Sequence, residues 1–220
     1  MSNTETIQNP ISRILKDKYL ILFLSIFYLV GAVGMSLEEY KEQFIALSAF
    51  HLSLNLAVLL LSKKSHTSKF YLLALAVLIL GMVVETIGTK TALLFGSYTY
   101  GNTLGLKIFG VPLIIGVNWL VLVIGCSSWV KNLKTSIWVK TLLAAALMTA
   151  LDFLIEPIAV EFNYWTWTEG EIPLFNYLCW FALSLPMHFA MLKWDLLENS
   201  KVPKAIVVMM FLFFIYLNLI

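Results

Sequence analysis

The chain has 220 residues, of which 60% are hydrophobic and 13% are charged, and its formal net charge is +2. Soluble domains contain about 45–50% apolar and about 25% charged residues, so this composition excludes an ordinary soluble fold and indicates an integral membrane protein. In such a protein the distribution of charge among the loops matters more than the net charge, and we expect no nucleic-acid partner. Cys126 and Cys179 lie within apolar runs, which predicts buried free thiols and no disulfide framework.

Seven apolar runs follow one another along the chain, and each is long enough to be interpreted as a transmembrane helix. They comprise residues 19–37, 44–61, 70–88, 111–130, 137–160, 173–192 and 202–220. Residues 1–18 are polar, and the first run is too long for the apolar part of a cleavable signal peptide. The sequence therefore predicts an all-α fold, with an N-terminal tail over residues 1–18 and a single seven-helix membrane domain over residues 19–220.

The basic residues predict how these helices are oriented. Twelve of the 15 Lys and Arg residues fall on one side of the predicted bundle. Loops rich in Lys and Arg remain in the cytoplasm, so we expect a cytoplasmic N-terminus and an external C-terminus, in a bacterial or archaeal cytoplasmic membrane. The twelve are Arg13, Lys16, Lys18, Lys63, Lys64, Lys69, Lys131, Lys134, Lys140, Lys193, Lys201 and Lys204, and the other three are Lys41, Lys90 and Lys107.

Two stretches, at about residues 70–130 and 137–192, resemble copies of one unit. The first contains Glu85-Thr-Ile-Gly, Tyr98-Thr-Tyr100, Val111-Pro112-Leu113 and Trp119, and the second contains Glu156-Pro-Ile-Ala, Trp165-Thr-Trp167, Ile172-Pro173-Leu174 and Trp180. Both prolines are expected in the first turn of a helix, where the missing backbone donor costs least. Both units begin on a helix expected to run outward, which predicts a parallel repeat about an axis along the membrane normal.

Three acidic residues, Glu85, Asp152 and Glu156, occur within or at the ends of apolar helices. A carboxylate near the bilayer centre costs about 2.5–3.5 kcal/mol even on insertion scales, so these residues are candidates for function. Asp152 and Glu156 are four residues apart and share a helix face, where repulsion and low dielectric favour retention of one proton. In a simpler interpretation, Glu156 reaches the outer interface and Glu85 pairs with Lys90, but Asp152 has no basic neighbour in sequence.

Other site types find little support. The three histidines, among them His51 and His188, lack the spacing of a di-iron membrane site, so no metal is expected. Lys204 stands at the start of its helix and so cannot form a retinal Schiff base, and no nucleotide-binding or diphosphate-binding motif is present. We therefore expect no cofactor, and we interpret polar residues such as His51, Asn55 and Asn118 as hydrogen-bond partners between helices.

As a set, these motifs resemble the carotenoid biosynthesis membrane proteins, in particular the carotenoid 1,2-hydratases of the CruF type. The resemblance covers about residues 80–190. It rests on the run from Glu85 through Phe95-Gly96 to Tyr98-Thr-Tyr100, on Gly110-Val-Pro-Leu with Trp119, on Asp152-x-x-x-Glu156-Pro, on Tyr164-Trp165-Thr-Trp167, and on Ile172-Pro-Leu-Phe-Asn176 with Trp180. It implies cofactor-independent addition of water across the terminal C1–C2 double bond of an acyclic carotenoid end group, as in lycopene or γ-carotene.

This implied reaction assigns roles to the candidate residues. Asp152 is the expected acid that protonates the alkene, and Glu85 or Glu156 is the expected base that takes a proton from water. Aromatic faces would stabilise the intermediate tertiary cation. The predicted substrate-binding residues are Tyr98, Tyr100, Trp119, Trp165, Trp167, Asn176 and Trp180. The implied partners are a carotenoid within the bilayer, membrane lipid and other enzymes of the carotenoid pathway.

Three alternatives remain open. A small membrane lycopene cyclase would trap the same cation with a double bond, but that family has a Pro-x-Glu-Glu pair where this chain has Pro112-Leu-Ile-Ile. A proton-coupled transporter would share the parallel repeats and intramembrane carboxylates, but it would also need matched Gly or Pro breaks in paired helices. A carotenoid or isoprenoid carrier would need the aromatic residues and not the carboxylates.

Overall fold

The computed structural model describes residues 10–220, with side chains described from residue 16 onward. Within this part of the chain there are eight helices and four short strands. The helices are α1 (Pro10–Ser36), α2 (Lys41–Ala46), α3 (Ser48–Ser62), α4 (Ser68–Thr91), α5 (Leu113–Val130), α6 (Ile137–Glu161), α7 (Leu174–Lys193) and α8 (Val202–Leu217). The strands are β1 (Tyr98–Tyr100), β2 (Lys107–Ile108), β3 (Val111–Pro112) and β4 (Trp165–Trp167). The all-helical class expected from the sequence is confirmed.

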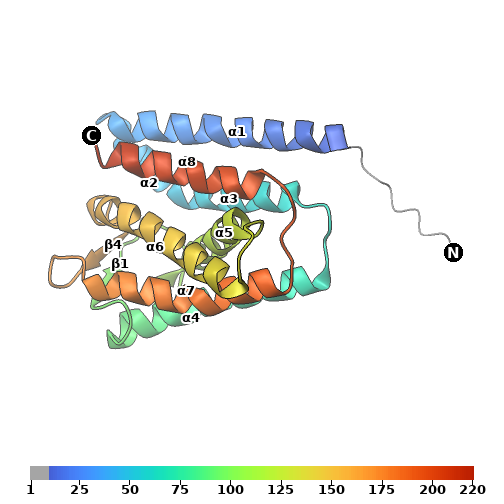
Figure 1. Cartoon of the computed structure of the whole chain (residues 1–220). Helices are drawn as coiled ribbons and strands as arrows, with labels where there is room; N and C mark the ends of the chain where they lie inside the picture. The colour runs from blue at the N-terminus through green and yellow to red at the C-terminus, as the bar shows by residue number, and fades with distance from the viewer. Residues whose placement is uncertain (1–9) are drawn as a thin grey trace.

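The long helices run back and forth between two ends of the molecule (Figure 1). Helix α5 lies at the centre and contacts α3, α4, α6, α7 and α8. It is apolar around its whole circumference, as expected for a helix surrounded by others. Its small residues permit the close packing typical of membrane helices: a Cβ at Gly116 would lie 2.9 Å from the carbonyl oxygen of Leu78, and one at Gly125 would lie 2.6 Å from Val207.

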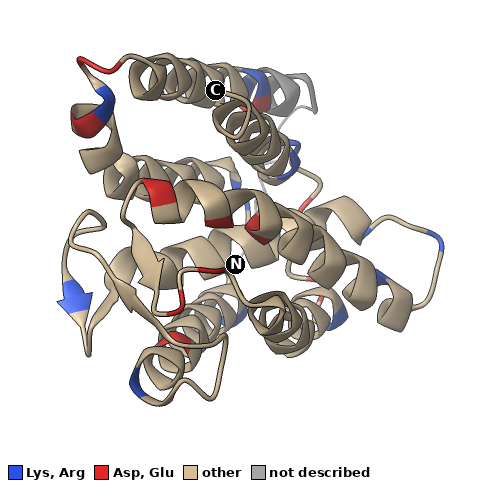
Figure 2. Ribbon diagram, turned by 90° about the vertical axis from the view of Figure 1, so that its left-hand side faces the viewer, with Lys and Arg blue, Asp and Glu red and all other residues tan. Residues whose placement is uncertain are grey.

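Two strand pairs form at one end of the bundle. Strands β1 and β4 pair antiparallel with Thr99 opposite Thr166, and β2 pairs antiparallel with β3. The first pair joins the loop after α4 to the loop after α6, although these loops are far apart in sequence. Figure 2 looks onto this end, where the paired strands lie close to acidic positions of the helices.

Five helices are long and apolar enough to cross a membrane: α1 from Lys16, α4, α5, α6 and α7. Helices α3 and α8 are apolar but have only 15 and 16 residues. At about 1.5 Å per residue they extend about 22–24 Å, less than the roughly 30 Å of a bilayer core. The structure is therefore that of a helical membrane protein with five candidate spans.

Several predicted boundaries were wrong. The helix predicted at 44–61 is divided at Leu47, whose N–H donates to the carbonyl of Phe44 at 3.1 Å, a tighter 3₁₀-type step. No Gly or Pro marks this break. A tertiary contact adjoins it, since the Ser48 hydroxyl bonds the Tyr164 hydroxyl. Helix α1 begins at Pro10, within the predicted tail, whereas its candidate membrane span begins at Lys16. The tail over residues 1–18 stays a prediction, and its residues 1–9 lie outside the described part.

The two repeat prolines also lie slightly earlier than expected. Pro112 and Pro173 occupy the N-cap positions of α5 and α7, with extended ψ values of 133° and 139°. The N–H group of an N-cap residue makes no hydrogen bond within the helix. A proline at the N-cap therefore costs no helical hydrogen bond, as is also true of a proline in the first turn. The expected free, buried state of Cys126 and Cys179 is confirmed.

Candidate functional site

The three acidic residues singled out in the sequence lie deep inside the protein. Glu85 comes from α4, and Asp152 and Glu156 come from successive turns of α6. Their exposed fractions are 2%, 1% and 2%. This burial contradicts the simpler interpretation in which Glu156 reaches the outer interface, and each carboxyl group needs hydrogen-bond donors from the protein.

Glu85 is surrounded by donors from the first repeat unit. Its Oε2 accepts hydrogen bonds from the hydroxyls of Tyr98 at 2.5 Å and Tyr100 at 2.7 Å, and its Oε1 accepts one from Trp119 Nε1 at 3.0 Å. The first two donors stand on β1 and the third on α5. Glu85 thus accepts its hydrogen bonds from aromatic side chains, whereas the simpler interpretation had paired it with Lys90.

Glu156 has a matching environment from the second unit. Its Oε2 accepts from the indole nitrogens of Trp165 and Trp167, both at 3.0 Å, and its Oε1 accepts from the Asn176 amide at 2.9 Å. The same amide nitrogen lies 3.1 Å from Asp152 Oδ2. Among the described residues, Asp152 therefore shares its single donor with Glu156, while each glutamate accepts three hydrogen bonds.

The paired strands place the aromatic donors of both units side by side. Tyr98 lies opposite Trp167 and Tyr100 opposite Trp165, with ring centroids 5.0 and 5.8 Å apart. Burial, reinforced by the Glu85 carboxyl, raises the pKa of both tyrosine hydroxyls far above its ordinary value. Both tyrosines are therefore neutral donors.

The two remaining aromatic candidates, Trp119 and Trp180, stack on each other. Trp119 and Trp180 have ring centroids 4.2 Å apart and an interplanar angle of 6°. Gly81, one turn before Glu85, makes room for the indole of Trp119, because a Cβ there would lie 2.7 Å from that ring. The corresponding position one turn before Glu156 carries Asp152.

A small pocket lies among these groups. It has about 20 Å³ of free space, which corresponds to about one water molecule. All three carboxylates line it, with Tyr98, Tyr100, Trp165, Trp167, Asn176 and Trp180. Trp119 does not line this pocket, although its indole N–H donates to Glu85. Among the described residues, no group of three or more His, Cys, Asp or Glu side chains has an arrangement that would hold a metal ion.

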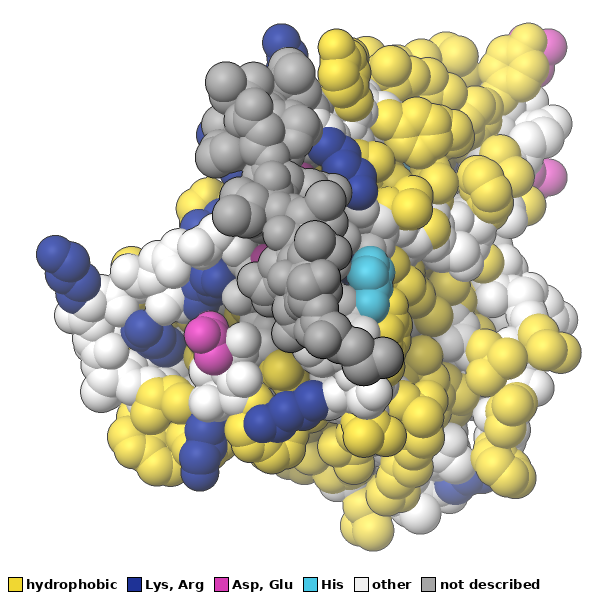
Figure 3. Space-filling view, turned by 90° about the vertical axis from the view of Figure 1, so that its right-hand side faces the viewer, with side chains coloured by type: hydrophobic (Ala, Val, Ile, Leu, Met, Phe, Trp, Pro, Cys, Tyr) yellow, Lys and Arg dark blue, Asp and Glu magenta, His cyan; other side chains and the backbone are white. Residues whose placement is uncertain are grey.

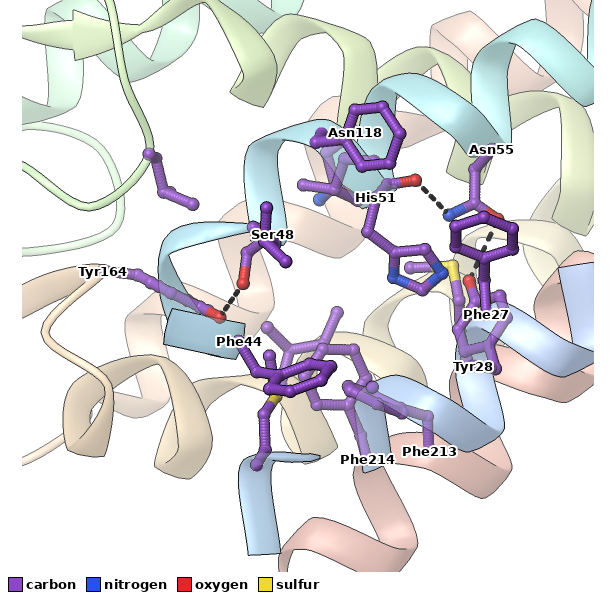
Figure 4. A pocket seen from close by; sticks show the side chains of 18 of the residues that line it. Phe27, Tyr28, Phe44, Ser48, His51, Asn55, Asn118, Tyr164, Phe213 and Phe214 are labelled. Carbon is purple, nitrogen blue, oxygen red and sulfur yellow. Dashed lines mark hydrogen bonds between the residues drawn. The ribbon is translucent and has the colours of Figure 1, made fainter. Parts of the chain in front are cut away.

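A larger apolar chamber of about 230 Å³ lies beside this pocket. It is bounded by α1, α2, α3 and α8, with α5, α6 and β4 on the inner side. Figure 4 shows His51 pointing into the space between Phe44 and Tyr28. Ile115, Asn118, Ile155 and Trp165 line both the chamber and the small pocket, so these spaces are neighbours.

Most of this chamber was not anticipated from the sequence. Asn55 and His51 stood out only as polar residues within an apolar run, and Asn55 does bond a neighbouring helix, accepting from the Tyr28 hydroxyl at 3.0 Å. Asn118 was expected to do the same, but its side chain makes no hydrogen bond to any described residue. Phe213 and Phe214 carried no signal at all, because they stand in an uninterrupted apolar run over residues 205–215 of α8.

Comparison with known proteins identifies the family. A family model described as carotenoid biosynthesis protein matches residues 40–220. The chain belongs to this family of carotenoid biosynthesis proteins. Neither the curated proteins nor the solved structures gave a match.

The family match covers every carboxylate and aromatic donor of the site in this carotenoid biosynthesis protein. It begins at Tyr40, so α1 lies outside it. The general resemblance found in the sequence is thereby confirmed, and the protein has a role in carotenoid biosynthesis. The match does not distinguish among reactions, so the reaction has to be argued from the site.

Proposed function

We propose that this carotenoid biosynthesis protein is a hydratase of the CruF type, which adds water across the terminal C1–C2 double bond of an acyclic carotenoid end group. The observation that carries the proposal is the buried carboxyl cluster. In this cluster Asp152 accepts few hydrogen bonds, whereas the two glutamates accept several each. The cluster also has space for about one water molecule, and it lies beside an apolar chamber.

Asp152 is the proposed acid. A carboxylate that accepts several hydrogen bonds is stabilised as the anion, whereas one that lacks donors in an apolar interior favours the neutral acid. Within the part of the chain that the structure describes, the Asn176 amide is the one donor to Asp152, and it is shared with Glu156. Keeping such a proton away from bulk water is how enzymes maintain a carboxylic acid for general-acid catalysis.

The reaction then balances without a cofactor. The Asp152 proton is transferred to C2, a C–H bond forms, and the double-bond electrons leave a tertiary cation at C1. Water adds through its oxygen to C1 and loses a proton to Glu156 or Glu85, which act as carboxylates. Return of that proton to Asp152 restores the starting state.

The aromatic residues contribute in two ways to this scheme. Their N–H and O–H groups donate hydrogen bonds to the two glutamates, which favours the anionic form of these carboxyl groups against the effect of burial. Their ring faces, stacked around the small pocket, would stabilise the cation by about 2 kcal/mol or more when water is excluded. We assign substrate binding to Tyr98, Tyr100, Trp165, Trp167, Asn176 and Trp180, which line the small pocket. Trp119, also expected from the sequence to bind substrate, does not line the pocket, so we assign it the positioning of Glu85 through its indole N–H.

We also propose seven membrane crossings, with α3 and α8 as short spans, a cytoplasmic N-terminus and an external C-terminus. Support comes from lysines gathered at the end of the molecule opposite the strands (Figure 3). The protein would lie in a bacterial or archaeal cytoplasmic membrane, with lipid, its carotenoid substrate and other pathway enzymes as partners.

A parallel repeat is part of the same proposal. The antiparallel β1–β4 pair, with Thr99 opposite Thr166, and the Trp119–Trp180 stack each place corresponding residues of the two units against each other. A twofold axis through these contacts would relate α4 and α5 to α6 and α7. The deeper acid Asp152 breaks the equivalence, which supports its separate role.

The test is to express the chain in a lycopene-accumulating bacterium and to analyse the pigments by mass, with ¹⁸O-labelled water and ¹⁸O₂ in parallel cultures. We expect a product heavier than lycopene by one water, with its oxygen derived from water. An isomer of unchanged mass would instead identify a cyclase, and unaltered lycopene would contradict both reactions.

A further inference from the structure

The apolar chamber is placed to deliver a long hydrocarbon to the carboxyl cluster. Its inner wall consists of the residues shared with the small pocket, among them Ile155 and Trp165. A molecule lying in the chamber would thus contact residues that also line the carboxyl pocket.

The outer wall of the chamber belongs to the apolar surface of the protein. Phe27 and Val30 of α1 are 37% and 50% exposed, and Phe50 of α3 is 56% exposed. In a membrane protein such a surface faces lipid. A ligand dissolved in the bilayer would therefore meet the helices that bound the chamber without passing through water.

The lining offers few hydrogen bonds to a ligand. The Asn55 amide donates to the His51 carbonyl at 2.9 Å and its oxygen accepts from Tyr28, while the hydroxyls of Ser48 and Tyr164 bond each other. His51 Nε2 is buried and has no hydrogen-bond partner among the described residues, and the His51 ring packs edge-on against Tyr28 with centroids 4.3 Å apart. The remaining lining is largely aliphatic and aromatic, which suits a hydrocarbon and not a sugar, nucleotide or other polar compound.

Asn118 is the polar group at the junction of the two spaces. It lines both of them, and its amide makes no hydrogen bond to any residue that the structure describes. An unpaired amide at this place can bind a water molecule, and water is the second substrate of the proposed reaction.

We propose that the chamber binds the acyclic isoprenoid segment of the substrate, with the reacting end group directed past Asn118 toward Asp152. This inference rests on the proposed hydratase function, which it deepens by assigning the substrate a site and a route from the bilayer. It adds Asn118 as a residue that orients water at the entrance of the carboxyl pocket.

Gly31 provides the variant that tests the chamber. It lines the chamber, and a Cβ built there meets only the Phe213 ring, at 3.6 Å. Gly31→Leu should therefore fill the space without disturbing the packing of α1. Val33→Leu is the matched control, because Val33 lies on the same helix, is 49% exposed and does not line the chamber.

The proteins are produced in a lycopene-accumulating host and purified in mild detergent. Lycopene retained per protein and the hydrated fraction of cellular pigment are then measured. We expect Gly31→Leu to lower both by about tenfold, and Val33→Leu to leave both unchanged. Leu52→Phe, which fills the chamber from α3, gives an independent second variant if Gly31→Leu does not yield a monodisperse protein.

The outcomes separate the two proposals. Wild-type retention and hydration in both filling variants would overturn the chamber assignment and leave the hydratase proposal intact. Lycopene retained by the wild type and lost from the filling variants, without any hydrated product, would support the chamber and refute the hydratase. To test Asn118 separately, Asn118→Leu should lower hydration while lycopene retention persists; unchanged hydration in that variant would exclude its role in orienting water.

Discussion

At the scale of single residues, the feature that distinguishes this site is the unequal supply of hydrogen-bond donors. Two carboxylates at similar depth, Asp152 and Glu156, differ because Glu156 also accepts from two indoles. Their positions in sequence predicted that both lie on one face of a helix. Only the fold shows that the shared Asn176 amide is the sole donor to Asp152 among the described residues.

Asp152→Asn removes the proposed acid and keeps the volume of the side chain. General-acid catalysis contributes about 10²–10⁴-fold, so hydration of lycopene should fall by at least about 10²-fold in cells. The measurement is the ratio of hydrated pigment to lycopene at equal protein abundance. Asp195→Asn, at an exposed position outside the site, should match the wild type; full activity in Asp152→Asn would eliminate the assigned role.

At the scale of secondary-structure elements, the β1–β4 pair holds the two units together at the site. Residues of each strand alternate, so Trp165 and Trp167 point inward and Thr166 is exposed. This alternation is the expected consequence of strand geometry. The sequence showed Trp-Thr-Trp and Tyr-Thr-Tyr as related motifs, but not that they pair in antiparallel register.

Thr166→Pro tests the importance of that pairing. Proline removes a backbone donor from the pair, and loss of one backbone hydrogen bond at this exposed position costs about 0.5–1.5 kcal/mol. We expect a lower free energy of unfolding in detergent by about that amount, together with reduced hydration because the indoles lose their positions. Thr166→Val favours a strand equally well and changes only an exposed side chain, so it should behave as the wild type. Equal stability of the two variants would show that the strand pair is dispensable.

At the scale of the whole molecule, the open question is how many helices cross the membrane. Helices α3 and α8 are short, yet the alternating course of the chain requires both to cross if lysine-rich loops stay on one side (Figure 1). A hydrophobic stretch shorter than the bilayer can be accommodated by local thinning at modest cost. The seven-crossing arrangement therefore does not need longer helices.

Reporter fusions decide this point. A reporter that is active only outside the cytoplasm should be active when fused after Ile220 and inactive when fused after Thr135, between α5 and α6. Activity in the opposite pattern would reverse the orientation. An inactive C-terminal fusion combined with an inactive fusion after Thr135 would show that α8 does not cross.

By itself, the sequence determined the membrane class, the approximate extent of the helices and the identity of the buried acids. It could do so because insertion into a bilayer depends on local composition, and each run of about 20 apolar residues carries that information within itself. The carboxylates stood out for the same reason, as residues that an apolar helix disfavours unless they have partners.

The hydrogen-bond partners of these acids depend on how the helices and strands pack, and so they could not be assigned before the fold was known. The break at Leu47, the chamber beside His51 and the free amide of Asn118 likewise depend on contacts between helices far apart in the chain. No local pattern encodes such contacts, because an aromatic or amide side chain in a membrane helix looks the same in sequence whether it faces lipid, a cavity or a carboxylate. The carboxyl cluster was therefore predictable as a set of residues, but its asymmetry and the apolar chamber beside it became visible only once the helices were packed.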